Sequence, residues 1–168
     1  MDKSHILGCF GMNRGYLDLL IDDIPDERFT QQPAGAKNHP AWHLGHLAQV
    51  ADSFASMLGA KSTLGEDWKA KYGMGSQPTS RRADYPSKAE LIRVLDDRRS
   101  ALAKAYERAT ASELDRPNST GMLTDAFPTI GRLMVFGMVS HENMHLGQLA
   151  AWRSAAGIGQ ALAKAAKA

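Results

Sequence analysis

Two histidines spaced four residues apart, His141 and His145, are the residues of this chain best suited to chemistry. Residues at this spacing stack on one face of a helix, so both imidazoles would point the same way. Neutral imidazole binds zinc, nickel, copper and iron, and two imidazoles make half of a tetrahedral site. Their neighbours include Met138 and Leu149, among which an unpaired imidazole would be costly to bury. The pair therefore favours a bound divalent transition metal, such as Zn, Ni or Fe, over two separately satisfied histidines.

A third ligand must come from another segment of the chain, where His43 and His46 are the candidates. His46 lies beside the expected core position Leu47, whereas His43 is one turn earlier and rotated from it by about 60°. We expect His46 to complete the site and His43 to have an ordinary packing, capping or solvent-exposed role. Three histidine ligands leave an open position on the metal, as in catalytic rather than structural sites.

The stretch from His141 to His145 also reads HExxH, the motif of zincin metalloproteases. Those enzymes need a third ligand downstream, but no Asp, Glu or His follows His145. The extended motif fails as well, because Gln148 and Ala151 occupy its glycine and histidine positions. The sequence therefore disfavours a metalloprotease. We expect Glu142 to be solvated or to act from outside the ligand shell, where a carboxylate could serve as a general base.

Two amide side chains could support the site. Gln148 lies one turn beyond His145 and could reach a metal-bound water or orient a ligand. Asn13 occupies a core-facing position of the first expected helix, and a buried amide needs partners that either the metal site or the main chain can supply. Glu142, Gln148 and Asn13 are therefore the candidate catalytic residues.

Apolar residues recur at three- and four-residue steps in four stretches, which predicts four helices. The expected helices span about 4–24, 40–58, 88–109 and 130–156. Pro40 fits a first helical turn, Ser87 begins an S-x-x-E capping box, and Gly157 is a suitable C-terminal stop. The stretch 59–86 is rich in Gly and Pro and predicts a long connection between the second and third helices. It should contain at most one short helix and could serve as a lid or a dimer contact.

These elements predict an all-α fold, a four-helix bundle over residues 1–157, followed by a frayed or disordered tail, 158–168. The charges of the third helix, such as Arg98, are expected on an ordinary solvated face. Cys9 is the only cysteine, which excludes an intrachain disulfide and favours a reducing compartment. It lies on an apolar stripe, where a lone cysteine is usually inert packing.

The charge and hydropathy of the chain exclude several classes of partner. Lys and Arg total 20 against 18 Asp and Glu, so the net charge of +2 provides no broad positive field for nucleic acid or anionic lipid. The longest apolar run, 133–139, is far shorter than the ~20 residues needed to cross a bilayer. The opening stretch lacks a secretory apolar region. We expect a cytoplasmic protein that binds neither nucleic acid nor membrane.

Three stretches together resemble the DinB-like superfamily of bacterial four-helix-bundle proteins. They are Asn13-Arg14 in the first helix, HPAWHLGHL at 39–47 and HENMHLGQL at 141–149. The resemblance implies that His46, His141 and His145 are the metal ligands, and it favours a homodimer. It also implies similarity to metal-dependent transferases that use a low-molecular-weight thiol such as mycothiol or bacillithiol, including maleylpyruvate isomerases.

Three hypotheses of function follow. In the first, a thiol loses its proton at the metal and attacks a small electrophilic substrate, which gives a thiol-dependent S-transferase or isomerase. In the second, water replaces the thiol and the protein is a metal-dependent hydrolase. In the third, the protein is a non-catalytic metal-binding stress-response protein. Thiol-dependent turnover of electrophiles separates the first hypothesis from the other two.

Overall fold

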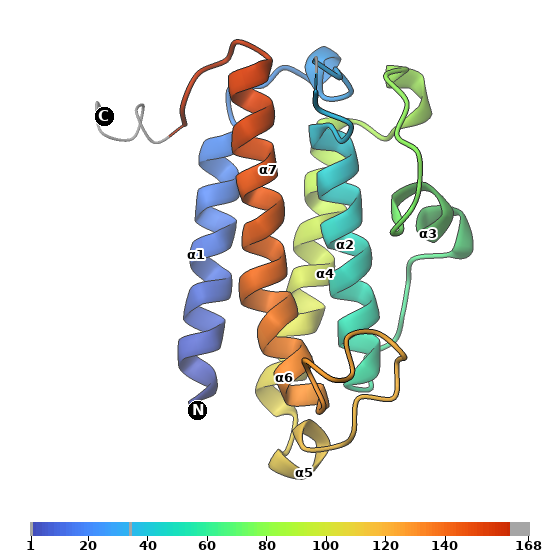
Figure 1. Ribbon diagram of the computed structural model, residues 1–168, viewed down its shortest axis with the longest axis vertical. Coiled ribbons are helices and arrows are strands. Elements are labelled where there is room, and N and C mark those ends of the chain that lie inside the picture. Colours follow the sequence, from blue (N-terminus) through green and yellow to red (C-terminus); the bar gives the residue numbers. More distant parts are fainter. Residues whose placement is uncertain (1, 34, 162–168) are drawn as a thin grey trace.

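The computed structural model describes residues 2–33 and 35–161, and within these ranges it contains helices and no β-strand. The long helical segments are α1 (Lys3–Ile21), α2 (Pro40–Met57), α4 (Lys88–Arg108) and a continuous run of α6 (Ile130–Val135), the π-helix η3 (Phe136–His141) and α7 (Glu142–Ala155). These segments lie side by side, with α2 packed on α4 and α1 packed on α7 (Figure 1). The predicted all-α fold class is confirmed.

Helix α1 ends at Ile21, one turn earlier than the predicted end near Ile24. The reason is a lysine from the start of α4. The ammonium group of Lys88 donates hydrogen bonds to the main-chain oxygens of Ile21, Asp22 and Ile24. Because these last carbonyls have a cationic partner, they need no further helical turn.

The helices α2 and α4 begin at the predicted signals. Pro40 is the first residue of α2, and the Nδ1 atom of His39 accepts a hydrogen bond from the backbone N–H three residues later. The hydroxyl of Ser87 caps α4 in the same way. The Glu90 carboxylate does not complete the predicted capping box, because it pairs with Arg93 instead.

The connection between α2 and α4 contains the short α-helix α3 (Glu66–Tyr72) and a 3-10 turn (Arg82–Asp84), whereas at most one short helix was predicted. Its first part is fixed to the bundle by the buried carboxylate of Asp52, which accepts hydrogen bonds from the Ser62 hydroxyl and the Thr63 N–H. The same carboxylate pairs with Arg98 of α4. The prediction that Arg98 is solvated was wrong, because a buried carboxylate requires a charged or hydrogen-bonding partner.

The remaining connections are short or irregular. A 3-10 turn (Asp26–Arg28) follows α1, and α5 (Ala111–Leu114) lies between α4 and α6. The last run of helix ends near Gly157, whose φ of 71° matches the predicted stop. Of the predicted tail, Ile158 and Ala161 pack against the core, and residues 162–168 lie outside the described residues.

Buried apolar side chains form two clusters, each drawing on all four long segments. In α1, for example, Phe10 belongs to one cluster and Leu17 to the other, and the buried Asn13 lies between them. The α4 helix and the last helical run repeat this pattern with Arg98, Arg99, Glu142 and His145. In α2 the buried His46 and Asp52 lie on either side of the point where one cluster gives way to the other. A layer of buried polar residues therefore crosses the middle of the helical bundle.

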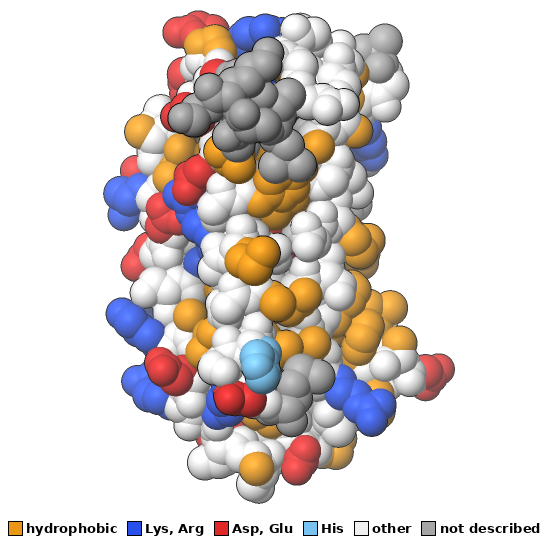
Figure 2. Space-filling view, turned by 90° about the vertical axis from the view of Figure 1, so that its left-hand side faces the viewer, with side chains coloured by type: hydrophobic (Ala, Val, Ile, Leu, Met, Phe, Trp, Pro, Cys, Tyr) orange, Lys and Arg blue, Asp and Glu red, His pale blue; other side chains and the backbone are white. Residues whose placement is uncertain are grey.

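The outer face of α1 carries apolar side chains in contact with solvent. Cys9 is exposed, as are Met12 and Leu19. Figure 2, which views the molecule from the side of α1, shows exposed hydrophobic side chains over this face and charged ones along its left edge. The prediction that Cys9 is buried was wrong. Helix α1 turns Phe10 toward the core, and Cys9, the residue before it, is rotated by about 100° around the helix axis and faces solvent. No helix in the described ranges combines the length and hydropathy needed to cross a membrane.

The π-helix was not predicted from the sequence. Within it, Gly137 lies directly against the ring of Phe54 from α2, so that a Cβ atom at this position would overlap the ring. Glycine is therefore required by the close approach of the two helices.

The change Gly137→Ala tests this packing. We expect it to lower the free energy of unfolding by about 1–3 kcal/mol, because an extra methyl group must displace the Phe54 ring. The control is Gly147→Ala in α7, where an added Cβ meets no atom within 4 Å. This variant should be stabilised by up to about 1 kcal/mol, since alanine is the better helix former. Urea unfolding measures both, and equal effects would contradict the packing argument.

Candidate metal centre

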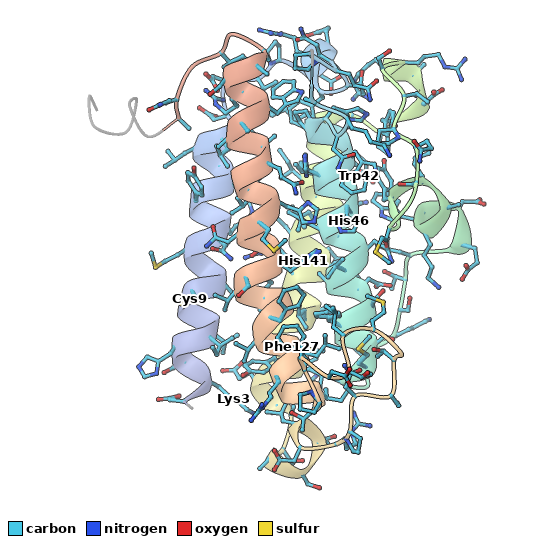
Figure 3. The ribbon with its side chains drawn as sticks, viewed as in Figure 1. Lys3, Cys9, Trp42, His46, Phe127 and His141 are labelled. Atoms are coloured by element: carbon cyan, nitrogen blue, oxygen red, sulfur yellow. The ribbon has the colours of Figure 1, made fainter. Side chains whose placement is uncertain are left out.

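Three histidines converge in the polar layer. His46 comes from α2, His141 from the end of the π-helix, and His145 from α7. The Nε2 atom of His141 lies 3.4 Å from Nε2 of His46 and 3.2 Å from Nε2 of His145. One ligand atom from each of the three side chains lies within 4.8 Å of the others. Figure 3 shows His46 and His141 in the space between α2 and α7. The structure thus brings together the three predicted metal ligands.

The spacing of these nitrogens fits a tetrahedral ion. Zinc–imidazole bonds of about 2.0–2.1 Å at tetrahedral angles place neighbouring ligand nitrogens about 3.3–3.4 Å apart. The two measured separations, 3.4 and 3.2 Å, agree with this geometry. The donor set of three imidazoles is also one that zinc, nickel and iron accept. The residues therefore fit a divalent transition metal.

Hydrogen bonding on the far side of the rings fixes which nitrogen is available. The Nδ1 atom of His46 is 2.7 Å from the main-chain oxygen of Tyr72. A carbonyl can only accept, so Nδ1 carries the proton and Nε2 presents its lone pair to the site. The Nδ1 atom of His145 is 3.2 Å from Nδ1 of His43. If His145 Nε2 is a ligand, then its Nδ1–H donates to His43.

The electrostatics of the site keep the imidazoles neutral. Burial lowers the pKa of His141 to about 4 and that of His145 to about 2, and the neighbouring histidines add to both shifts. Burial also lowers the pKa of His46. Burial lowers the pKa of His43 to about 3, so its Nδ1 atom is free to accept a hydrogen bond. Neutral imidazole is the form that binds a metal.

The glycine before His46 explains how α3 reaches the site. The ring of Tyr72, the last residue of α3, lies against the backbone of Gly45, and a Cβ atom on Gly45 would overlap it. The main-chain oxygen of Gly45 also accepts a hydrogen bond of 2.9 Å from Trp68 of α3. Gly45 thus allows α3 to deliver the Tyr72 carbonyl to His46. The 59–86 connection therefore supports a ligand, a role that the sequence did not reveal.

An aromatic ring holds the plane of His46. The indole of Trp42 is stacked on the imidazole, with ring centroids 4.7 Å apart and an interplanar angle of 9°. The Trp42 Nε1–H donates to the hydroxyl of Ser76 in the 59–86 connection. Stacking and the Tyr72 carbonyl together restrict rotation of the ligand, which favours metal binding by reducing the entropy lost on coordination.

Glu142 is buried rather than solvated, so that part of its prediction was wrong. It pairs with Arg99 of α4, whose guanidinium group also donates to the main-chain oxygen of Phe10 and lies 3.6 Å from the centre of the Phe10 ring. Burial lowers the pKa of Arg99 to about 10, which leaves it charged at neutral pH. A buried cation requires a counterion, and Glu142 provides it. The Oε2 atom of Glu142 has no partner among the described residues.

The two predicted amides occupy different environments. Gln148 is exposed and lines a cavity of about 430 Å³ together with His43, but none of the three triad histidines lines this cavity. Asn13 is buried, and its amide nitrogen donates to the main-chain oxygens of Met138 and Val139 at 3.2 and 3.3 Å. The sequence left open whether the metal site or the main chain supplies the partners of Asn13. The structure shows that the main chain does.

Sequence reasoning missed the role of His43. Its side chain is only 2% exposed and contacts the ligand His145 from the side opposite His141. The prediction of an ordinary role rested on its rotation from His46 along α2. That rotation is real, but it directs His43 toward the Nδ1 side of His145 on α7. The sequence of α2 alone cannot reveal a contact with another helix.

A comparison with models of protein families finds a match. The model of the DinB superfamily matches residues 10–149, a range that includes all three histidines. A comparison with curated proteins finds no match.

The change Gly45→Ala tests the support that α3 gives to the site. The added methyl group should displace Tyr72 and remove its carbonyl from His46, so we expect metal affinity to fall about 10–100-fold. Competition with a chromogenic chelator measures this affinity, and circular dichroism verifies that the variant is folded. Gly147→Ala, which adds a methyl group to open space, should bind metal like the wild type. Wild-type affinity in a folded Gly45→Ala protein would contradict the proposed support.

Proposed function

The chain belongs to the DinB superfamily, and on that premise we propose that it is a metal-dependent enzyme that uses a low-molecular-weight thiol to transfer or isomerise small electrophilic molecules. The observation that carries the proposal is the convergence of three neutral imidazoles, with no fourth His, Cys, Asp or Glu joining them among the described residues. A site with three protein ligands keeps a coordination position open for a reactant. A divalent ion bound there would supply Lewis-acid chemistry that favours the deprotonated form of a thiol.

The residues around the triad would hold the ligands still while a reactant binds. His46 is held by Trp42 and the Tyr72 carbonyl, and His145 is held by His43. Such outer contacts fix ring orientation before the reactant arrives, so less ordering is required during the reaction.

A pocket of about 670 Å³ lies where α4, α5 and α6 meet, and its apolar walls suit the apolar part of an electrophile, although none of the three histidines lines it. Phe127 and Phe136 line it and stack on each other with centroids 4.5 Å apart. The Phe136 ring is in turn 5.8 Å from the ring of His141. Ser140, the residue before His141, also lines the pocket, and Arg132 and Asp115 contribute one charge of each sign. This combination favours a substrate with a flat apolar body and a polar group.

Two further residues keep proposed roles. Glu142 follows His141 directly and has one carboxylate oxygen without a hydrogen-bond partner in the described part of the chain, so it is our candidate proton acceptor. Gln148 lines the cavity behind His43, where it would contact a bound ligand rather than the reacting atoms. The predicted homodimer and the cytoplasmic location stay predictions.

Turnover assays with purified protein lacking a His tag test the proposal. The protein is loaded with zinc, nickel or iron and is given a low-molecular-weight thiol with a panel of electrophiles. Loss of free thiol reports transfer, which consumes the thiol, and loss of the electrophile at constant thiol reports isomerisation, which releases the thiol again. We expect turnover that requires both metal and thiol and falls to background in His145→Ala, because two imidazoles no longer hold the ion. Glu27→Ala, an exposed change outside the bundle core, is the matched control and should retain wild-type turnover.

Two outcomes would contradict the proposal. Ester or amide hydrolysis without thiol, abolished by His145→Ala, would identify a hydrolase instead. Stoichiometric metal with no activity toward the electrophiles, and none toward esters or amides, would indicate a metal-binding protein that is not an enzyme.

A further inference from the structure

The π-helix ends at the metal ligand His141, and its backbone hydrogen bonding is irregular at that point. In an α-helix the N–H of Glu142 would donate to the main-chain oxygen of Met138, four residues back. Here it donates to the oxygen of Val139, three residues back. The main-chain oxygen of Met138 therefore does not receive the N–H that a regular α-helix would give it. A buried carbonyl of this kind is stabilised by a further donor. Single π-turns inside α-helices are rare and are frequent at functional sites.

Asn13 of α1 supplies a donor to this stretch of backbone from another helix. Its Nδ2 atom lies 3.2 Å from the Met138 oxygen and 3.3 Å from the Val139 oxygen. Both partners can only accept, so the orientation of the amide is fixed with its NH₂ group toward the π-helix. Asn13 is only 6% exposed, and the residues one turn before and after it, Phe10 and Leu17, are core residues. The donor is therefore held rigidly from a neighbouring helix.

The register of this helix decides where His141 points. A change of one residue in helical register rotates all following side chains by about 100°. Residues before the π-helix, such as Leu133 and Met134, are fixed in the core, and Gly137 is fixed against Phe54. A return of the segment to regular α-helical bonding would therefore turn His141 and His145 relative to His46 on α2.

We propose that Asn13 is a positioning residue for the metal ligands, acting through the π-helix to set the direction of His141. The proposal rests on the metal site proposed above. It assigns Asn13 no contact with a reactant: its two bonds are to main-chain oxygens, and its effect on chemistry passes through the ligand geometry. The class of ligand it serves is a divalent cation that prefers tetrahedral nitrogen coordination.

Cobalt(II) binding to the full-length protein tests the proposal, because the visible absorption of cobalt reports ligand geometry as well as affinity. The change Asn13→Leu fills similar space but removes the donor. We expect it to raise the cobalt dissociation constant about 10–100-fold and to alter the absorption bands. Asn13→Gln keeps an amide donor and should recover part of the loss.

A matched control separates positioning from stability. Leu17→Ala removes core packing one turn away on the same helix, so it should lower the melting temperature at least as much as Asn13→Leu. It should leave the cobalt spectrum and dissociation constant unchanged. Wild-type affinity and spectrum in Asn13→Leu would overturn the proposal. An equal loss of affinity in Leu17→Ala would also overturn it, because stability alone would then explain the effect.

Amide hydrogen exchange on the metal-free proteins gives a readout that does not depend on the ion. Asn13→Leu should speed exchange locally, over 136–143, whereas Leu17→Ala should speed it across α1 and its neighbours. Exchange in Asn13→Leu that is unchanged over 136–143 would overturn the link between Asn13 and the π-helix. The wild-type protein could also fail to bind cobalt while Asn13→Leu still exchanges faster than the wild type over 136–143. That result would overturn the metal site and the positioning role, and it would leave Asn13 as a support of the backbone.

Discussion

The constraint from which the rest of the structure follows is the convergence of three imidazoles in the interior of a helical bundle. The Nε2 atom of His141 lies 3.4 Å from that of His46 and 3.2 Å from that of His145. Buried histidines with lone pairs turned toward one another are stabilised when each ring is held on its other side and a cation or proton lies between them. The elements around the site meet the first requirement for two of the three rings. Helix α3 brings a carbonyl to His46, and α2 brings His43 to His145. The Nδ1 atom of His141 has no hydrogen-bond partner among the described residues, and α1 supports this residue only through the backbone that precedes it.

The polar layer that contains the site divides the apolar core in two. This arrangement lowers the free energy of unfolding that a single continuous core would give a domain of this size. Buried ion pairs such as Arg99–Glu142 and Arg98–Asp52 seldom add stability compared with apolar packing, because each ion must be desolvated. Removing one partner, in contrast, leaves an uncompensated charge. Such pairs fix the relative register of the helices that carry them, and register is what a three-ligand site drawn from separate helices requires. The layer is therefore best understood as a framework for the three converging histidines and not as a source of stability.

Much of this architecture could be predicted from the sequence, because it depends on local periodicity. The three- and four-residue spacing of apolar residues located the long helices, and the four-residue spacing of His141 and His145 located half of the site. The errors concern contacts between segments. The burial of Arg98 depends on Asp52 of another helix, the exposure of Cys9 depends on which side of α1 meets α7, and the π-helix depends on a donor more than 100 residues away in the chain. Gly45 was visible as part of a motif, but its purpose requires the position of Tyr72. None of these contacts has a local pattern from which it could have been read.

The most direct test of the account is X-ray absorption spectroscopy of the protein loaded with one equivalent of zinc. The account predicts three imidazole nitrogens at about 2.0–2.1 Å and one further light ligand in a tetrahedral site. The imidazole contribution should fall to two in His46→Ala, with the fold retained. A spectrum of the wild-type protein with no imidazole scattering, or with one imidazole among five or six oxygens, would contradict it, since the ion would then be bound elsewhere and the three histidines would not form a metal centre.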